Sequence, residues 1–407
     1  MTYNYEQLLK LSQEYGDAFY ILHVDQFKKN FVELKTAFTD IYSHFNIAYS
    51  YKTNYIPRLV QAVNELGGFA EVVSDMEVNI ARYAGVPAGK IIFNGPYKNA
   101  KAVEELLLSG GTVNIDSRFE LSVIEKIRKD YPNASFNLGI RVNFAINDGI
   151  LSRFGIDVES EDFREVLKYV TSTPGIHFIG LHCHFAARSL ETWRPRVVGM
   201  LKLISSLGIN PKHIDLGGGM FGKMAEELKK QFKNYIPSFS EYAVEVANVF
   251  AEYYKNIPDE QRPLLLLEPG SALVGDCMSL VTKVQSIKTV RGKTIATILA
   301  SMYNINMGNK FPPLRVIAQP GRERKTYAEL DFAGFTCIES DYLYRSYSGP
   351  LAVGDYIVMD NVGSYSIVFK PPFILPNFAV IALKDDGSID LIKRAEKFDD
   401  LFQTYYF

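Results

Sequence analysis

The chain has 407 residues, a length that predicts two or three domains, or one barrel with an addition. Hydrophobic residues make up 47% of it and charged residues 22%, which is typical of a soluble globular protein. The 44 basic and 46 acidic residues give a net charge of −2, so we expect no overall attraction to nucleic acid or to an anionic membrane surface. These numbers favour a globular enzyme with no nucleic-acid or membrane partner.

The cysteines and the N-terminus predict the compartment. Cys183, Cys277 and Cys337 are widely spaced and odd in number, which argues against a disulfide framework or a structural zinc site. The sequence does not begin with a signal-peptide pattern, and no apolar run reaches the roughly 20 residues that span a bilayer. We therefore expect a cytoplasmic protein.

Apolar runs alternate with helical segments between residues 25 and 268. The first helix is predicted over Asp25–Ser43, where large apolar residues recur at spacings of three and four. Eight buried strands are predicted at Asn46–Ser50, Phe69–Val73, Lys90–Phe93, Thr112–Ile115, Asn137–Val142, His177–Leu181, His213–Leu216 and Leu264–Leu267. Helical segments lie between them, among them Lys98–Ser109, Arg118–Lys129, Leu190–Leu207 and Ser240–Tyr254. This order indicates βαβ units, and the count of eight favours a closed (β/α)₈ TIM-like barrel over an open doubly wound sheet.

The pattern changes after Glu268. Strands separated by Gly, Pro, Asn and Asp turns are predicted at Val281–Val290, Lys293–Leu299, Asp355–Met359, Ser366–Phe369, Ala379–Leu383 and Ser388–Ile392. Asp17–Val24 is a further strand candidate for the same sheet. We therefore expect a barrel over residues 25–268, and an all-β domain made of residues 1–24 and 269–407.

Residues with reactive or polar side chains follow several of the predicted barrel strands, at the end where TIM barrels carry out their chemistry. Lys52 follows the first strand, and among aromatic residues its amine could be desolvated and nucleophilic, although most lysines are simply solvated. The Gly217–Gly219 turn suits a phosphate, but it could equally be a tight βα turn. His184 could stack on a planar ring or bind a metal. Glu268 closes an apolar strand, and a buried carboxylate needs a partner such as a protonated ring nitrogen.

Taken together, these four features describe a site for pyridoxal 5'-phosphate. A Rossmann dinucleotide site is disfavoured because residues 217–219 do not fit the GxGxxG pattern. A metal site is the weaker interpretation because no HxxxH motif or nearby acid pair accompanies His184, and we predict none. His182 is expected to pack or to form hydrogen bonds in the barrel wall.

The sequence resembles the fold-type III pyridoxal-phosphate decarboxylases, the group of ornithine, arginine and diaminopimelate decarboxylases, with alanine racemase as a more distant relative. The resemblance spans nearly the whole chain. The matching segments are Tyr51–Asn54, Val73–Glu77, Ser152–Gly155, His182–His184, Leu216–Gly219, Glu268–Gly270, Gly334–Cys337, Asp341, Gly354–Asp355 and Gly363–Tyr365.

The resemblance implies a role for each matching residue. Lys52 would form the Schiff base with the cofactor, His184 would stack on its ring and Glu268 would pair with the ring nitrogen. The expected cofactor-binding residues are Lys52, Glu71, Arg141, His184, Gly218, Gly219, Glu268, Gly270, Ser271 and Tyr365. The expected catalytic residues are Lys52, His184 and Cys337. Family members are homodimers with shared active sites, so Cys337 of the partner subunit would return a proton to the substrate.

The sequence departs from the family pattern at residues that bind ligands. Ser271 replaces the arginine of EPGR, and Ala187 replaces the serine of HxGS. Residues 311–315 read FPPLR, so Phe311 replaces the arginine of RPxLY. Ile338 stands where an acid usually follows the cysteine, and Glu339, one residue later, would point to the other face of a strand. We therefore expect a larger or modified amino acid as the substrate, rather than free ornithine, lysine or diaminopimelate. Candidate substrate-binding residues are Arg188, Arg315 and Asp341, and Arg188 could instead replace the missing cation.

The acid at position 268 also predicts the type of reaction. A carboxylate keeps the ring nitrogen protonated and so supports a quinonoid intermediate, whereas alanine racemases place an arginine there. We therefore expect α-decarboxylation of an amino acid or an amino-acid conjugate. A racemase or epimerase, and a non-catalytic homologue that binds pyridoxal phosphate, remain the alternatives.

Overall fold

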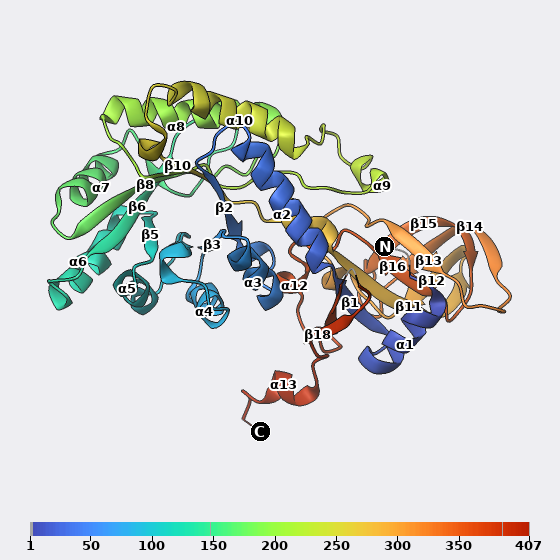
Figure 1. Ribbon diagram of the computed structural model, residues 1–407. Coiled ribbons are helices and arrows are strands. Elements are labelled where there is room, and N and C mark those ends of the chain that lie inside the picture. Colours follow the sequence, from blue (N-terminus) through green and yellow to red (C-terminus); the bar gives the residue numbers. More distant parts are fainter. Residues whose placement is uncertain (1–2, 147, 385, 407) are drawn as a thin grey trace. The chain divides into compact units, whose positions relative to one another are not determined.

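The computed structural model describes residues 3–146, 148–384 and 386–406 (Figure 1). The chain folds into two compact units. We call residues 28–222 and 234–272 the barrel unit, and residues 1–27, 223–233 and 273–407 the sheet unit. The division differs from the boundaries expected from the sequence by a few residues at each junction, and it assigns the excursion 223–233 to the sheet unit.

The barrel unit is a closed sheet of eight parallel strands. These are β2 (Phe45–Ser50), β3 (Phe69–Val72), β4 (Ile91–Phe93), β5 (Thr112–Ile115), β6 (Phe136–Asn143), β8 (Ile176–His182), β9 (His213–Asp215) and β10 (Leu264–Leu267). The strand order is β5-β4-β3-β2-β10-β9-β8-β6, and the pairing of β5 with β6 closes the ring. A short strand, β7 (Ile156–Asp157), pairs with β6 outside this ring. The predicted barrel is confirmed.

Helices surround the barrel strands, as Figure 1 shows. They are α2 (Val24–Thr39), α3 (Pro57–Glu65), α4 (Asp75–Tyr83), α5 (Ala100–Leu108), α6 (Leu121–Asp130), α7 (Glu161–Ser172), α8 (Trp193–Leu207), α10 (Phe239–Tyr253) and the short α11 (Ser271–Val274). Each long helix buries one apolar face, as expected for a barrel covered on its outside. The chain thus leaves the C-terminal end of each strand through a loop, and these loops carry the site described below.

The sheet unit contains one mixed sheet. Its strands are β1 (Ala18–Leu22), β11 (Met278–Val290), β12 (Lys293–Ile298), β13 (Leu314–Ile317), β14 (Lys325–Ala333), β15 (Tyr342–Leu351), β16 (Tyr356–Met359), β17 (Ala379–Leu383) and β18 (Ile389–Lys393). The main order is β15-β14-β12-β11-β1-β17-β18, and β16 pairs with both β11 and β13. The strand expected within residues 17–24 is therefore confirmed as β1, which is central in the sheet.

The sheet unit also contains helices, so it is not purely β. The predicted strand Ser366–Phe369 is wrong, because these residues form α12, which begins after Tyr365 in the left-handed region (φ 61°). An apolar run of four residues carries no periodicity that separates strand from helix. Helices α1 (Tyr5–Tyr15), α9 (Glu226–Lys229) and α13 (Phe398–Phe402), and strands β13, β14 and β15, were not predicted. No helix in the described part of the chain has the length and hydropathy needed to cross a membrane.

Candidate active site

A layer of buried polar side chains lies at the C-terminal ends of the barrel strands. Each of the eight strands contributes one, within the strand or in the residue that follows it: Ser50, Glu71, Asn94, Asn114, Arg141, His182, Asp215 and Glu268. All eight are at most 7% exposed. Buried polar groups are costly unless they are paired, so this layer marks the end of the barrel that is organised for chemistry.

Lys52 lies in a 3₁₀ turn, Tyr51–Thr53, directly after β2, and its amine faces this layer. Its Nζ is 2.6 Å from Oε2 of Glu71, a residue on the neighbouring strand β3 that is only 1% exposed. The same oxygen accepts a hydrogen bond of 2.6 Å from Oγ of Ser50, and Oε1 accepts one from Nδ2 of Asn94. A third of the lysine side chain remains exposed, so the amine is held by a fixed carboxylate and stays accessible to a ligand.

Glu268 has a buried carboxylate that is kept ionised. Nδ2 of Asn94 donates to its Oε1 at 2.5 Å, and Nε2 of His182 lies 3.3 Å from the same atom. Burial alone would raise the pKa of Glu268, but His182 and the charge of Lys52 outweigh it and hold this pKa well below the usual range. Glu268 is therefore a carboxylate that can pair with a cation brought by a ligand.

His184 contacts both the acid and the glycine turn. Its Nδ1 accepts the N–H of Gly218 at 3.0 Å and lies 3.7 Å from Oε2 of Glu268. Burial lowers the pKa of His184, and a nitrogen that accepts a backbone N–H carries no proton. The ring is thus neutral, and the hydrogen bond from Gly218 in the glycine turn fixes its position.

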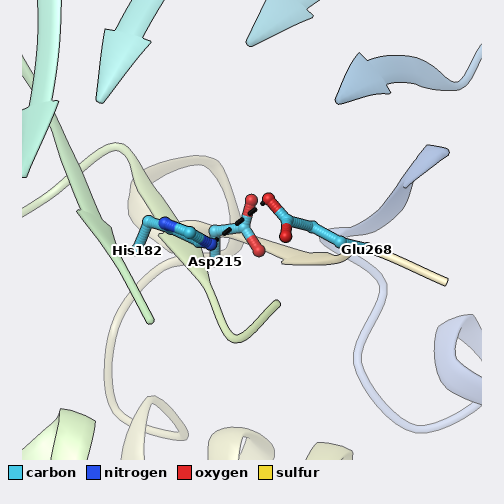
Figure 2. A group of neighbouring side chains, drawn as sticks. All are labelled: His182, Asp215 and Glu268. Carbon is cyan, nitrogen blue, oxygen red and sulfur yellow. Dashed lines mark ion pairs between the residues drawn. The ribbon is translucent and has the colours of Figure 1, made fainter. Parts of the chain in front are cut away.

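His182, Asp215 and Glu268 form a compact buried cluster, and Figure 2 shows the three side chains pointing toward one another. His182, expected to pack or to form hydrogen bonds in the barrel wall, is buried there with its ring facing Glu268. Burial and the neighbouring charge of Glu268 raise the pKa of Asp215 well above its usual range, whereas the pKa of Glu268 is held low. One ligand atom from each of the three residues lies within 4.8 Å of the others, which is a spacing that a metal could use. However, Oε1 of Glu268 already accepts from Asn94, and the absence of a metal stays a prediction.

The Gly217–Gly219 turn presents unused backbone donors. A Cβ on Gly219, where φ is +92°, would lie 2.9 Å from the carbonyl oxygens of Phe185 and Ala187, so only glycine fits here. Within residues 3–146, 148–384 and 386–406, no group accepts a hydrogen bond from the amide of Gly219 or of the buried Met220. Backbone N–H groups that face outward from a tight turn are donors for a phosphate.

The other expected barrel residues lie in different settings. Arg141 is buried and donates to Oδ1 of Asp116 at 3.2 Å. Gly270 is buried so closely against the side chain of Thr53 that no Cβ fits. Ser271 begins the short helix α11. Arg188 is exposed and lies over the ring of Phe221, with 5.7 Å between its guanidinium carbon and the ring centroid.

The sheet unit holds the remaining expected residues. Tyr365 lines a cavity of about 390 Å³ together with the loop of residues 302–311 and α12. Asp341 is buried, and its carboxylate accepts from the amides of Met302 and Thr336 and from the hydroxyl of Thr336, so it anchors the loop that carries Cys337.

Arg315 does not line this cavity, because its guanidinium pairs with Asp360 at 2.9 Å. Residues 334–341 form a loop and not a strand, so the argument that alternation turns Glu339 away from Ile338 is wrong. Cys337 and Glu339 are exposed in this loop.

Sequence reasoning missed several residues that the fold brings into the site. Asn94 joins Glu71 to Glu268, Asn114 supports Asn94 with a hydrogen bond of 2.8 Å, and Arg196 on α8 lies beneath the glycine turn. The two asparagines lie at the ends of predicted strands, a position that could have drawn attention to them. No sequence signal distinguishes Arg196 from any other arginine on a helix.

The residues present fit pyridoxal 5'-phosphate. The amine of Lys52 suits its aldehyde, the ionised Glu268 suits a protonated ring nitrogen, and the free amides of the glycine turn suit its phosphate. The closed barrel and this site together define an enzyme that uses pyridoxal phosphate.

Comparison with known proteins identifies the family. Residues 24–275 match the family described as "Pyridoxal-dependent decarboxylase, pyridoxal binding domain". The match covers more than half of the chain, and the chain belongs to the family of pyridoxal-dependent decarboxylases. By family it is a pyridoxal-phosphate-dependent amino-acid decarboxylase.

Individual relatives are distant but match along nearly the whole chain. The diaminopimelate decarboxylase of Aquifex aeolicus is 26% identical over 96% of this chain and 92% of its own. The L-glutamyl-[BtrI acyl-carrier protein] decarboxylase of Niallia circulans is also 26% identical, over 99% of this chain and 97% of its own. The crystal structure of the diaminopimelate decarboxylase of M. jannaschii in complex with L-lysine has a TM-score of 0.87 at 24% identity, over 98% of this chain and 94% of that one. At that identity, the likeness of the structures shows the fold.

Proposed function

We propose that this chain catalyses the α-decarboxylation of an amino acid or amino-acid conjugate, with Lys52 as the residue that attaches the cofactor. The observation that carries the proposal is Glu268, a fully enclosed carboxylate whose pKa is held well below the usual range beside the accessible amine of Lys52. When bound, pyridoxal phosphate supplies a protonated ring that takes up the electron pair left by the departing carboxylate. An ionised acid at position 268 favours that protonated ring, which supports decarboxylation over racemisation.

Glu71, His184 and Asn94 then have separate tasks. Glu71 holds Nζ of Lys52 at 2.6 Å and can accept a proton from it, which leaves the amine free to react with an aldehyde. His184, kept neutral and fixed by the amide of Gly218, presents a flat ring face for packing on the cofactor. Asn94 orients Glu71 and Glu268 at once through its amide group.

Return of the proton requires an acid on the opposite side of the substrate, and we assign it to Cys337 of the partner subunit. Its thiol is exposed in a loop that Asp341 anchors, so it is free to enter a neighbouring site in a homodimer. In the wider family pattern the cysteine occupies this place, and the GFTC sequence matches it. A homodimer with shared sites is therefore part of the proposal.

For the substrate, we propose an amino acid with an apolar or acylated side-chain extension. Ile338, directly after Cys337, stands where the family pattern has an acid that holds a distal ammonium group. Without that acid, a free distal ammonium group is costly to desolvate. The relative from Niallia circulans, whose substrate is a glutamyl group on a carrier protein, supports a conjugate.

The function is tested by cofactor binding and carbon dioxide release. We expect the purified holoenzyme to show a cofactor absorbance band that borohydride fixes to Lys52, and Lys52→Ala to lose both the covalent link and carbon dioxide release. Lys101→Ala, on the exposed face of α5, is a control that should keep both. A borohydride-reducible link that persists in K52A would refute the role of Lys52.

The substrate class is tested by a panel of free and acylated amino acids. Efficient release of carbon dioxide from free diaminopimelate, ornithine or lysine would refute the proposed substrate class and leave the reaction type intact. Loss of optical rotation without carbon dioxide release would instead favour the racemase alternative.

A further inference from the structure

Arg196 on α8 is a buried cation with no role in the function proposed above. Its side chain is 0% exposed, and the ion pairs found within the described residues do not include it. The guanidinium carbon lies 4.0 Å from the ring centroid of Trp193 and 5.3 Å from that of Phe185. A guanidinium buried without a carboxylate is costly, so its charge has to be offset by other groups.

The guanidinium donates only to backbone carbonyls, and these belong to two loops. Nη1 donates to the carbonyl oxygens of Leu216 at 3.2 Å and Gly218 at 2.7 Å, and Nη2 to those of Phe185 at 3.4 Å and Ala187 at 3.3 Å. The first loop is the glycine turn, and the second follows His184. Arg196 therefore ties together the two segments that resemble the phosphate-binding motifs of the family.

The geometry of the peptide bond determines where the donors of the turn point. In a trans peptide the C=O and N–H groups are antiparallel, and the described residues contain no cis peptide. Since the carbonyl of Gly218 faces Arg196, the N–H of Gly219 in the same peptide points away from it. This is one of the two amides that find no acceptor in the described chain.

We propose that Arg196 is a positioning residue for the phosphate of the cofactor. It orients the glycine turn so that the free amides face the phosphate, and it places a positive charge behind them. Its charge thereby compensates for two residues of the family pattern that this chain lacks: the arginine at position 271, which is Ser271 here, and the serine at position 187, which is Ala187 here. Arg188, the replacement suggested by the sequence, is exposed, and its guanidinium lies over the ring of Phe221. The inference rests on the proposed function, because it presupposes that pyridoxal phosphate binds here.

The test compares binding of pyridoxal 5'-phosphate with binding of pyridoxal, which has no phosphate. The full chain, freed of cofactor, is titrated with each ligand and followed by absorbance, as wild type, R196M, R196K and R194M. We expect R196M to weaken binding of the phosphate ester by about 10- to 100-fold and to change binding of pyridoxal far less. This range corresponds to weakening one or two hydrogen bonds between the amides of the turn and the charged phosphate. R196K, which keeps the charge but not the planar fork, should lie between wild type and R196M.

Arg194 is the matched control, because it lies on the same helix, its side chain is 63% exposed, and its ion pair with Glu245 is long, at 4.0 Å. R194M should bind both ligands as the wild type does. If R196M and R196K bind both ligands more weakly by the same factor, Arg196 has a merely structural role and the inference is overturned. If R196M does not fold, R196K decides, since an unchanged preference for the phosphate ester in R196K would also overturn it.

The two proposals fail in distinguishable ways. A wild type that binds neither ligand would refute the proposed function and this inference with it. A wild type that prefers the phosphate ester, together with an R196M that keeps the same preference, would overturn only the role of Arg196.

Discussion

Asn94 offers a sharp test of how the buried polar layer is held together. Its side chain is 1% exposed and makes three hydrogen bonds: Nδ2 donates to Glu71 at 3.2 Å and to Glu268 at 2.5 Å, and Oδ1 accepts from Asn114 at 2.8 Å. Asn94→Ala removes all three and leaves two buried carboxylates without their common donor. A hydrogen bond to a charged group contributes about 1.5–3 kcal/mol and a neutral one about 1 kcal/mol.

The full sum overstates the loss, because both carboxylates keep other partners. Glu71 retains Ser50 and Lys52, and Glu268 retains His182. We therefore expect N94A to lower the free energy of unfolding of the barrel by about 3–5 kcal/mol.

The matched control is Asn137→Ala. Its Nδ2 donates a single hydrogen bond of 3.0 Å to the carbonyl of Gly110 in an exposed setting, so its removal should cost only about 1 kcal/mol. The single tryptophan of the chain, Trp193, is buried in the barrel unit, so its fluorescence during urea titration reports unfolding of the barrel. If N94A loses no more stability than N137A, the shared donor is not what stabilises the two carboxylates.

Three further outcomes follow from the same geometry. Burial raises the pKa of Glu77 to about 7 from 4.5, so the folded chain holds this proton more tightly than the unfolded chain and stability falls as the pH rises between these values. Glu77→Gln should remove this loss, so its free energy of unfolding relative to wild type should rise by up to about 3 kcal/mol between pH 5 and pH 8. If the two proteins show the same dependence of unfolding free energy on pH, the reasoning is wrong. Gly219→Ala should weaken cofactor binding by about tenfold in an absorbance titration, because its Cβ would lie 2.9 Å from the carbonyl oxygen of Ala187 at a positive φ. An unchanged affinity would refute the role of the glycine turn in binding the phosphate. Mixing Lys52→Ala and Cys337→Ala chains should restore carbon dioxide release through one intact site per mixed dimer, and complete inactivity would count against sharing between subunits.

The residues expected from motifs and the residues that support them differ in how far the sequence specifies their positions. Lys52, Gly218, Gly219 and Glu268 lie within or next to predicted strands, and the parallel barrel brings strand ends to one rim. Their proximity could thus be inferred once eight strands were counted. The short apolar strands themselves, such as Leu264–Leu267, follow from local hydrophobicity alone.

Other elements depend on context that no local pattern contains. Ser366–Phe369 is short, with three apolar residues after Ser366, so its helical state depends on the turn at Tyr365 and on its packing. Residues 334–341 form a loop in which Asp341 accepts from the nearby amide of Thr336 and from the amide of Met302, which is 39 residues away in the sequence. The alternation argument about Ile338 and Glu339 failed for that reason.

The sequence by itself predicted the closed barrel from short-range patterns and strand order, and it predicted pyridoxal phosphate from the residue types at the strand ends together with the family resemblance. Only the tertiary structure decided the states of those residues. It brings Asn94 between two carboxylates, turns His182 toward Glu268 and buries Arg196 behind the glycine turn. Charge states and hydrogen bonds of buried groups depend on neighbours in space, and positions in a linear pattern do not specify those neighbours.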